Sequence, residues 1–337
     1  MQKDEPGGFL RPLRRRDLIV MLGAAVAFPR AAAAQAAGQP KLVGLLLPEV
    51  GSMARSRLKA FRDRLEELGY REGREYRLAV RYTSPNDPEV VRRDGAGLLA
   101  LAPALVLTNA NISALAMHEL TSSVPVVFAG YLGDPIASGF AASYNRPGGN
   151  MTGVLFATDV ALLGKQLALL KEMAPGIGRV EALVSNANPA VPRLVADAGA
   201  KLGLVMRISV VANAEELLAR LNSSDPLPDA YFFGPGPLFI AARNETVAFV
   251  DRARRPALFS FRELADAGGL ISYGADIDAM NRAAADYAAK ILNGAAPGDL
   301  PIDTPALYKM VINLKTAKAM GLTIPSTLLA RADEVIE

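Results

Sequence analysis

Small polar residues gather where the predicted strands of this chain end, and their types suit the binding of a charged group. Ligands of parallel α/β sheets bind beyond the carboxyl ends of the strands. Backbone N–H groups and Ser, Thr or Asn side chains at helix N-termini suit a carboxylate or another anion there. At any single position, capping of the following helix is the simpler role, so the set of loops is more informative than any one of its members. The candidate ligand-binding residues of these loops are Ser52, Thr108, Asn109, Asn111, Asn186, Asn188 and Gly234.

One acidic residue and several aromatic residues extend this candidate site. Asp134 follows a predicted strand in a glycine-flanked loop, where its carboxylate could pair with a ligand ammonium group. Formation of a turn explains Asp134 equally well. Tyr131, Phe261 and Tyr273 lie at strand ends, where they could sandwich an apolar or ring-bearing ligand. Phe259 fits the core at least as well.

The residues that most enzymes use for catalysis are scarce. His118 is the single histidine and the chain has no cysteine, so the second ligand of a zinc motif is missing. No Gly-x-Ser-x-Gly sequence supplies a serine nucleophile. The Gly-Pro-Gly-Pro sequence at 234–237 lacks the glycine spacing and the lysine of a nucleotide-binding turn. We therefore expect no catalytic site, no metal and no cofactor.

After residue 40, short apolar runs alternate with segments of helical length, which is typical of parallel βαβ units. The segment 58–68 carries leucines and Phe61 at steps of three and four residues, and Gly69 follows as a C-cap. A Leu-Gly pair ends a helix in each of two successive series, which suggests two α/β lobes of like design. The predicted strands are 41–47, 76–82, 104–108 and 126–129 in the first series, and 180–184, 205–210, 230–233, 257–260 and 270–273 in the second.

The sequence divides into four parts. We expect a signal peptide at 1–34, an N-terminal lobe at 35–157, a C-terminal lobe at 158–274, and a crossover and C-terminal segment at 275–337. The last part contains a helix between Asp276 and Asn293, a strand at 308–312 and a helix at 313–320. Part of 275–300 could return to the first lobe, which would give more than one crossover.

The first 34 residues have the pattern of an export signal. Arg14, Arg15 and Arg16 precede an apolar run at 18–28, which is much shorter than the ~20 residues that span a bilayer as a helix. The paired arginines resemble a twin-arginine signal, and an arginine-rich Sec signal is the alternative. Cleavage is expected after Ala34, because signal peptidase requires small residues there.

Removal of this segment makes the chain electrically neutral. The whole chain has 37 Lys and Arg and 34 Asp and Glu, of which residues 1–34 contain six and three. The sequence pI near 9.1 would suggest a nucleic-acid partner, and the neutral mature chain excludes that interpretation. A lipid anchor is also excluded, because it requires a cysteine at the new N-terminus. We expect a periplasmic protein with no membrane anchor, and a monomer.

Several stretches of the sequence, in order, match the pattern of a known family. They are 133–139 (GDPIASG), 146–153 (RPGGNMTG), 261–263 (FRE), 267–274 (AGGLISYG), 312–318 (INLKTAK), 324–325 (IP) and 332–334 (ADE). With them the chain resembles the substrate-binding proteins of ABC transporters related to the tryptophan-binding protein TrpX. The similarity covers essentially the whole chain.

This resemblance implies a type I periplasmic binding protein fold, with two Rossmann-like lobes, a multi-strand hinge and a ligand enclosed between the lobes. It also implies delivery to a membrane permease with an ATPase subunit. Characterised members bind amino acids, aromatic ones among them. The sequence departs from the usual family pattern at 48–52 (PEVGS) and at 109–111 (NAN), which would face the ligand.

The main functional hypothesis is an extracytoplasmic protein whose lobes close on one small organic molecule. A ligand-sensing subunit that reports occupancy to a receptor kinase is the second hypothesis. An exported enzyme built on the same sheets is the third, and the single histidine and missing cysteines argue against it.

Overall fold

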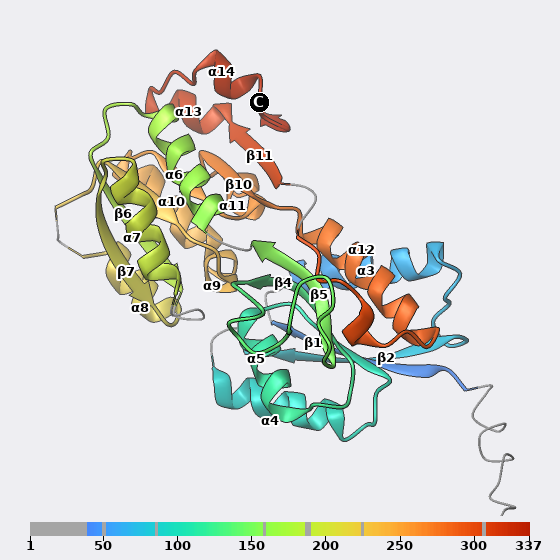
Figure 1. Cartoon of the computed structure of the whole chain (residues 1–337). Coiled ribbons are helices and arrows are strands. Elements are labelled where there is room, and N and C mark those ends of the chain that lie inside the picture. The colour runs from blue at the N-terminus through green and yellow to red at the C-terminus, as the bar shows by residue number, and fades with distance from the viewer. Residues whose placement is uncertain are drawn as a thin grey trace, which may run out of the picture. The chain divides into compact units, whose positions relative to one another are not determined.

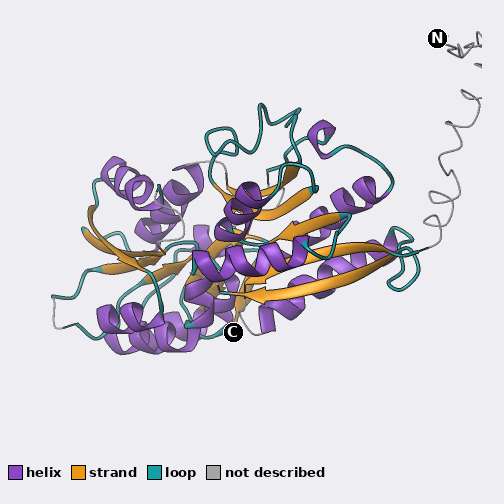
Figure 2. Ribbon diagram, turned by 90° about the horizontal axis from the view of Figure 1, so that it is seen from below, coloured by secondary structure: helices purple, strands orange, loops and turns teal. Residues whose placement is uncertain are grey.

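The computed structural model describes residues 39–48, 52–84, 87–157, 160–185, 190–223, 226–304 and 308–337. The expected signal peptide at 1–34 lies outside the described residues. Within them, the strands form one sheet of five strands and one of seven. Helices flank the strands of both sheets (Figure 1, Figure 2).

The first sheet is built mainly from the N-terminal half of the described chain. Its elements are β1 (Lys41–Pro48), α3 (Ser52–Glu67), β2 (Tyr76–Thr83), α4 (Pro88–Leu99), β3 (Leu105–Thr108), α5 (Asn111–Leu120), β4 (Val126–Leu132) and β5 (Met151–Ala157), joined by the later helix α12 (Ile277–Leu292). All its strand pairs are parallel, and the order β2-β1-β3-β4-β5 is that of a doubly wound sheet.

Successive side chains of each strand point to opposite faces of this sheet, so the strands contribute to two apolar cores. Leu45 and Leu107 pack in the core that contains residues of α3 and α12. Leu46 and Val106 pack in the core that contains residues of α4 and α5. The two helix pairs therefore cover opposite faces (Figure 1).

The second sheet repeats this design and adds two strands. Its elements are α6 (Val160–Met173), β6 (Arg179–Ser185), α7 (Val191–Lys201), β7 (Val205–Val211), α8 (Ala214–Leu221), β8 (Ala230–Phe233), α9 (Pro237–Ala241), α10 (Arg243–Ala253), β9 (Ala257–Phe259), α11 (Arg262–Asp266), β10 (Ile271–Ala275), β11 (Tyr308–Asn313), α13 (Leu314–Met320), α14 (Ser326–Leu329) and β12 (Glu334–Ile336). The order β7-β6-β8-β9-β10 matches that of the first sheet strand for strand. Next, β11 pairs antiparallel with β10, and β12 pairs parallel with β11.

Traced through the described elements, the chain passes between the two sheets three times. It leaves the first sheet after β5, returns after β10 into α12, and leaves again before β11. Helix α12 contacts α3, β3, β4 and β5. The following segment contains the 3₁₀ turn η1 (Pro297–Asp299), and Asp303 then bonds to the edge of β5, through its N–H to Gly153 O at 3.0 Å and its carbonyl to Leu155 N at 2.9 Å.

The predicted α/β fold with two parallel-sheet lobes is confirmed, and every predicted strand is present. Strand β4 continues to Leu132 rather than ending at Ala129. Strands β5 and β12 were not predicted. In β5 the pattern is interrupted by Gly153, a residue type that is a weak strand former.

Candidate functional site

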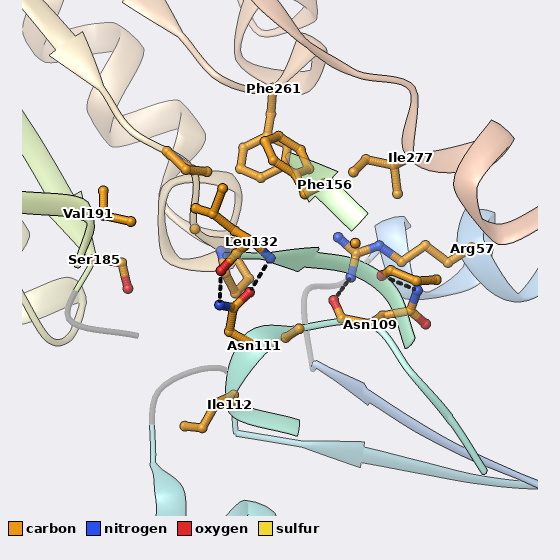
Figure 3. A pocket seen from close by; sticks show the side chains of 16 residues that line it. Arg57, Asn109, Asn111, Ile112, Leu132, Phe156, Ser185, Val191, Phe261 and Ile277 are labelled. Atoms are coloured by element: carbon orange, nitrogen blue, oxygen red, sulfur yellow. Dashed lines mark hydrogen bonds between the residues drawn. The ribbon is translucent and has the colours of Figure 1, made fainter. Parts of the chain in front are cut away.

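A cleft lies beyond the carboxyl ends of strands from both sheets, and it contains about 670 Å³ of empty space that is partly open to solvent. Residues at or after the ends of β3, β4 and β5 line one side, and residues after β6, β8 and β9 line the other (Figure 3). This is where parallel sheets bind ligands. The lining residues are Arg57, Asn109, Ala110, Asn111, Ile112, Ala129, Gly130, Leu132, Phe156, Ser185, Val191, Pro235, Gly236, Pro237, Phe261 and Ile277.

Arg57 of α3 brings the one cationic side chain among these lining residues. Its side chain is 4% exposed, and burial lowers its pKa to about 10 against the attraction of Glu263 and Asp278. One terminal nitrogen donates to Asn109 O at 3.5 Å, the outer limit of a hydrogen bond, and the buried Nε has no partner. Burial of a charged group is costly unless it is paired, so this guanidinium favours an anionic ligand group.

Two asparagines of the cleft wall are held in place by bonds to other residues. Asn109 Nδ2 donates to Asn281 Oδ1 of α12 at 2.8 Å, while its own Oδ1 is buried without a partner. Asn111 clamps the end of β4, because its Oδ1 accepts from Leu132 N at 2.9 Å and its Nδ2 donates to Leu132 O at 2.6 Å (Figure 3). The amide of Asn111 thus shapes the wall of the cleft.

Apolar side chains form most of the remaining wall. Phe156 of β5 and Phe261, which precedes α11, lie with ring centroids 5.6 Å apart and planes tilted by 50° (Figure 3). Ile112 and Val191 lie at other parts of the wall, and Pro235 and Pro237 stiffen the loop after β8. Such a surface suits an apolar or aromatic ligand body.

The predicted residues Asn109, Asn111 and Phe261 are brought together in this cleft. Ser52 begins α3, but its side chain lies outside the described residues, as do Asn186 and Asn188 entirely. Thr108 ends β3 fully buried, with an Oγ1 that has no partner. Gly234 is buried and directly precedes Pro235, which lines the cleft. A Cβ added at Gly234 would lie 3.2 Å from the side chain of Val184, so there is little room for a larger residue.

The other predicted residues lie outside the cleft lining. Tyr131 is buried beside Phe140, its hydroxyl lies 2.6 Å from Ser138 Oγ, and burial raises its pKa. Asp134 is a turn residue, because its Oδ1 accepts from Ile136 N at 2.8 Å. Tyr273 stacks on Tyr308 with centroids 5.9 Å apart.

Three important lining residues were not predicted. Phe156 belongs to the unpredicted strand β5, and Ile277 is the first residue of α12. Arg57 lies on a helix with many charged residues, most of them solvent-exposed. Its signal in the sequence is its position, because the buried residues of α3 include Ala54, Leu58, Phe61 and Leu65, and Arg57 falls on their face.

The described residues contain neither a metal-binding cluster nor a membrane-spanning helix. Among the described residues, no three His, Cys, Asp or Glu side chains are grouped so as to hold a metal ion. His118 is exposed and packs its ring 5.0 Å from that of Phe140. None of the helices in the described ranges is both long and apolar enough to cross a membrane.

Comparison with known proteins identifies a family and a curated relative of this chain. Residues 51–336 match the family model of the ABC transporter substrate binding protein. A tyrosine-binding protein of Clostridioides difficile is 21% identical over 268 residues, which cover 78% of this chain and 76% of the relative.

Two solved structures have the same fold. The ABC domain of Streptococcus pneumoniae in complex with L-Trp is 25% identical, with a TM-score of 0.80, over 88% of this chain and 100% of that one. A conserved domain protein of Vibrio cholerae is 22% identical, also with a TM-score of 0.80, over 88% and 99%. The chain belongs to the family of ABC transporter substrate-binding proteins, which capture a solute for an importer and are not enzymes.

Proposed function

We propose that this protein binds an aromatic L-amino acid in the cleft between its two sheets. The observation that carries the proposal is Arg57, a buried guanidinium with an unpaired Nε, in a wall that is otherwise mostly apolar. A ligand carboxylate would supply the missing partner in a bidentate, charge-assisted arrangement. The ligand would thereby offset the cost of burying Arg57.

The ligand body would occupy the apolar side of the cleft. The ring pair Phe156 and Phe261 offers a face and an edge to a third ring, and Leu132 and Val191 add aliphatic contacts. The relatives support an aromatic ligand, since one is named for tyrosine and a solved structure contains L-Trp. Asn111 is bonded to Leu132 at both ends of its amide, so its role is to fix the wall.

We also propose how the protein is exported and which partners receive its ligand. A twin-arginine signal would direct export, cleavage after Ala34 would release a neutral chain into the periplasm, and the chain would act as a monomer without a membrane anchor. It would deliver its ligand to a permease with an ATPase subunit. The arginine-rich start, the apolar run and the small residues that follow support the export step.

A thermal-shift screen of the mature chain against the twenty L-amino acids tests the proposal. A ligand at 100 times its Kd stabilises a protein by about 2.7 kcal/mol. We expect L-tryptophan, L-tyrosine or L-phenylalanine to raise the melting temperature, and isothermal titration to give one site per chain.

The D-enantiomers and the aliphatic amino acids are the matched controls for this screen. Binding confined to charged or small polar amino acids would contradict the apolar assignment of the cleft. Absence of any shift with all twenty amino acids would refute the proposed ligand class.

A further inference from the structure

A second cavity adjoins the ligand cleft, and the two share Arg57 and Ile277 in their walls. It contains about 930 Å³ of empty space that includes open solvent, and it lies where the chain crosses between the sheets. In contrast to the cleft, its wall is strongly charged. Its lining residues are Ser56, Arg57, Arg262, Glu263, Gly274, Ala275, Asp276, Ile277, Asp278 and Lys309.

Most of these charges are already satisfied. Arg262 bonds to Asp266 at 3.2 Å and to Glu334 at 3.1 Å. Lys309 Nζ lies 2.6 Å from Asp276 Oδ2. Asp278 accepts from Ser56 Oγ at 2.9 Å.

Arg57 and Glu263 are the exceptions in this wall. They come from helices of different lobes, α3 and α11, and attract each other electrostatically. Nevertheless, the described structure contains no ion pair between them, and Arg57 Nε and Glu263 Oε2 are both buried without a partner. Burial raises the pKa of Glu263, as expected for a carboxyl group that lacks a bound cation.

A group that carries both charges would satisfy both residues at once. The head of an α-amino acid has a carboxylate and an ammonium on the same carbon. With the side chain in the apolar cleft and the carboxylate on Arg57, the ammonium is left to face the charged cavity. Asp134, the carboxylate that sequence reasoning suggested for this role, is engaged in its own turn outside both cavities.

We propose that Glu263 is the counter-ion of the ligand ammonium group, and that with Arg57 it makes the site selective for zwitterionic amino acids over plain carboxylates. This inference rests on the proposed function. A ligand without the amine would leave Glu263 buried and unpaired, which is how polar sites reject analogues that lack a hydrogen-bonding group.

The test compares each aromatic amino acid with its desamino analogue on the Glu263→Gln variant. The pairs are L-tryptophan with indole-3-propanoate, L-tyrosine with 3-(4-hydroxyphenyl)propanoate, and L-phenylalanine with 3-phenylpropanoate. By isothermal titration, Glu263→Gln should weaken binding of the amino acid about 10- to 100-fold, which corresponds to one charged hydrogen bond. Binding of the desamino partner should change less than about threefold.

Asp266→Asn is the matched control. Asp266 lies on the same short helix and loses the same charge, but it lines neither cavity. It should leave the ratio of the two affinities at the wild-type value. A ratio that falls equally in Asp266→Asn and Glu263→Gln would overturn the specific role of Glu263.

Glu263→Asp protects the test against a misfolded glutamine variant, because it keeps the charge. It should lose affinity only for the amino acid, and by less than Glu263→Gln. Equal loss for the amino acid and its desamino partner in both variants would overturn the inference. If the wild-type chain binds no aromatic amino acid, the proposed function fails as well; if it binds one and Glu263→Gln binds it equally well, only the role of Glu263 fails.

Discussion

Arg57 combines two properties that rarely occur together in a purely structural residue. It is almost completely buried, yet among the described residues its hydrogen bond is a long one, to the main-chain carbonyl of Asn109. In the empty protein such a guanidinium costs stability, because it loses hydration without gaining a full partner. A residue that is costly without ligand and compensated with it can link binding to stability.

Replacement of Arg57 by glutamine should separate these two effects. Affinity for the aromatic amino acid should fall about 10- to 100-fold, since a hydrogen bond to a charged group contributes about 1.5–3 kcal/mol. The melting temperature of the ligand-free protein should not fall, because an unpaired buried charge has been removed. Isothermal titration and differential scanning calorimetry measure the two quantities.

Arg55→Gln is the matched control for this prediction, because Arg55 lies two residues earlier on α3 and is exposed. Its affinity and melting temperature should both stay at the wild-type values. A ligand-free Arg57→Gln protein that is several degrees less stable than wild type would indicate a structural role instead.

Part of the cleft could be predicted from the sequence, because strand ends can be recognised in it. Asn109, Asn111 and Phe261 follow apolar strands, and the carboxyl-end rule brings them together. Tyr131 also lies at a strand end, but a bulge in β4 precedes it and its ring packs on Phe140 in the core. The direction in which a side chain points at a strand end depends on such local shifts in register, and these cannot be read from the sequence.

At the level of elements, the pairing of β5 with β4 requires glycine at position 153. Gly153 of β5 has a φ of +146°, and a Cβ there would lie 2.1 Å from the carbonyl oxygen of Phe128. The same residue accepts the bond from Asp303 N that ties the returning segment to the sheet. The glycine that interrupts the strand pattern is therefore what allows this strand to pair.

Gly153→Ala should destabilise the protein by at least about 3 kcal/mol, because the clash is with backbone that cannot move aside as a side chain can. Urea unfolding measures the change. Gly97→Ala is the control, since a Cβ at that exposed position of α4 meets nothing within 4 Å. It should stabilise the chain by about 0.5–1 kcal/mol. Equal effects at the two glycines would contradict this account.

Elements with a clear signal in the sequence, such as a periodic apolar pattern or a capping residue, were predictable, and elements without such a signal were not. The helix at 277–292 was recognisable because Asp276 caps it, and its carboxylate does accept from Ala279 N at 3.0 Å. Strand β12 has three residues and pairs only with β11. So short an element takes its conformation from its neighbour and leaves little trace in the sequence.

Asp276 also makes the stability of the chain depend on pH. Burial alone would raise the pKa of Asp276, but Lys309 and the backbone N–H of Ala279 outweigh it and hold the pKa below its ordinary value. A carboxylate with a depressed folded-state pKa stabilises the fold above its unfolded pKa of about 3.9, and this contribution is lost as the pH falls through the folded value.

Asp276→Asn should therefore be less stable than wild type by about 1 kcal/mol at pH 7, since asparagine still caps the helix but the partly exposed ion pair is gone. The difference should stay constant down to about pH 4 and shrink towards zero below it. Urea titrations at pH 7, 5, 4 and 3 measure it. A difference that persists unchanged at pH 3 would exclude the charge as its cause.

At the level of the whole molecule, the two sheets have the same order in five strands and are connected by three crossings of the chain. They also contribute to one apolar core. Leu45 of β1, Phe156 of β5 and Phe233 of β8 belong to the same cluster of buried residues. The ligand cleft is lined from both sides of this arrangement. Ligand contacts should consequently reach elements of both sheets rather than one.

Hydrogen exchange with and without L-tryptophan or L-tyrosine should show this coupling. Added ligand should slow exchange in peptides covering 109–112 and 129–132 from the first sheet, and in peptides covering 235–237 and 261–263 from the second, because all of them contain cleft residues. A separate surface groove between α8 and α10 is lined by Leu218 and Phe249 and lies outside the cleft. Peptides that contain these two residues should therefore exchange at the ligand-free rate. Protection confined to one sheet would mean that the ligand rests on a single lobe, and closure of both lobes around it would then have to be abandoned.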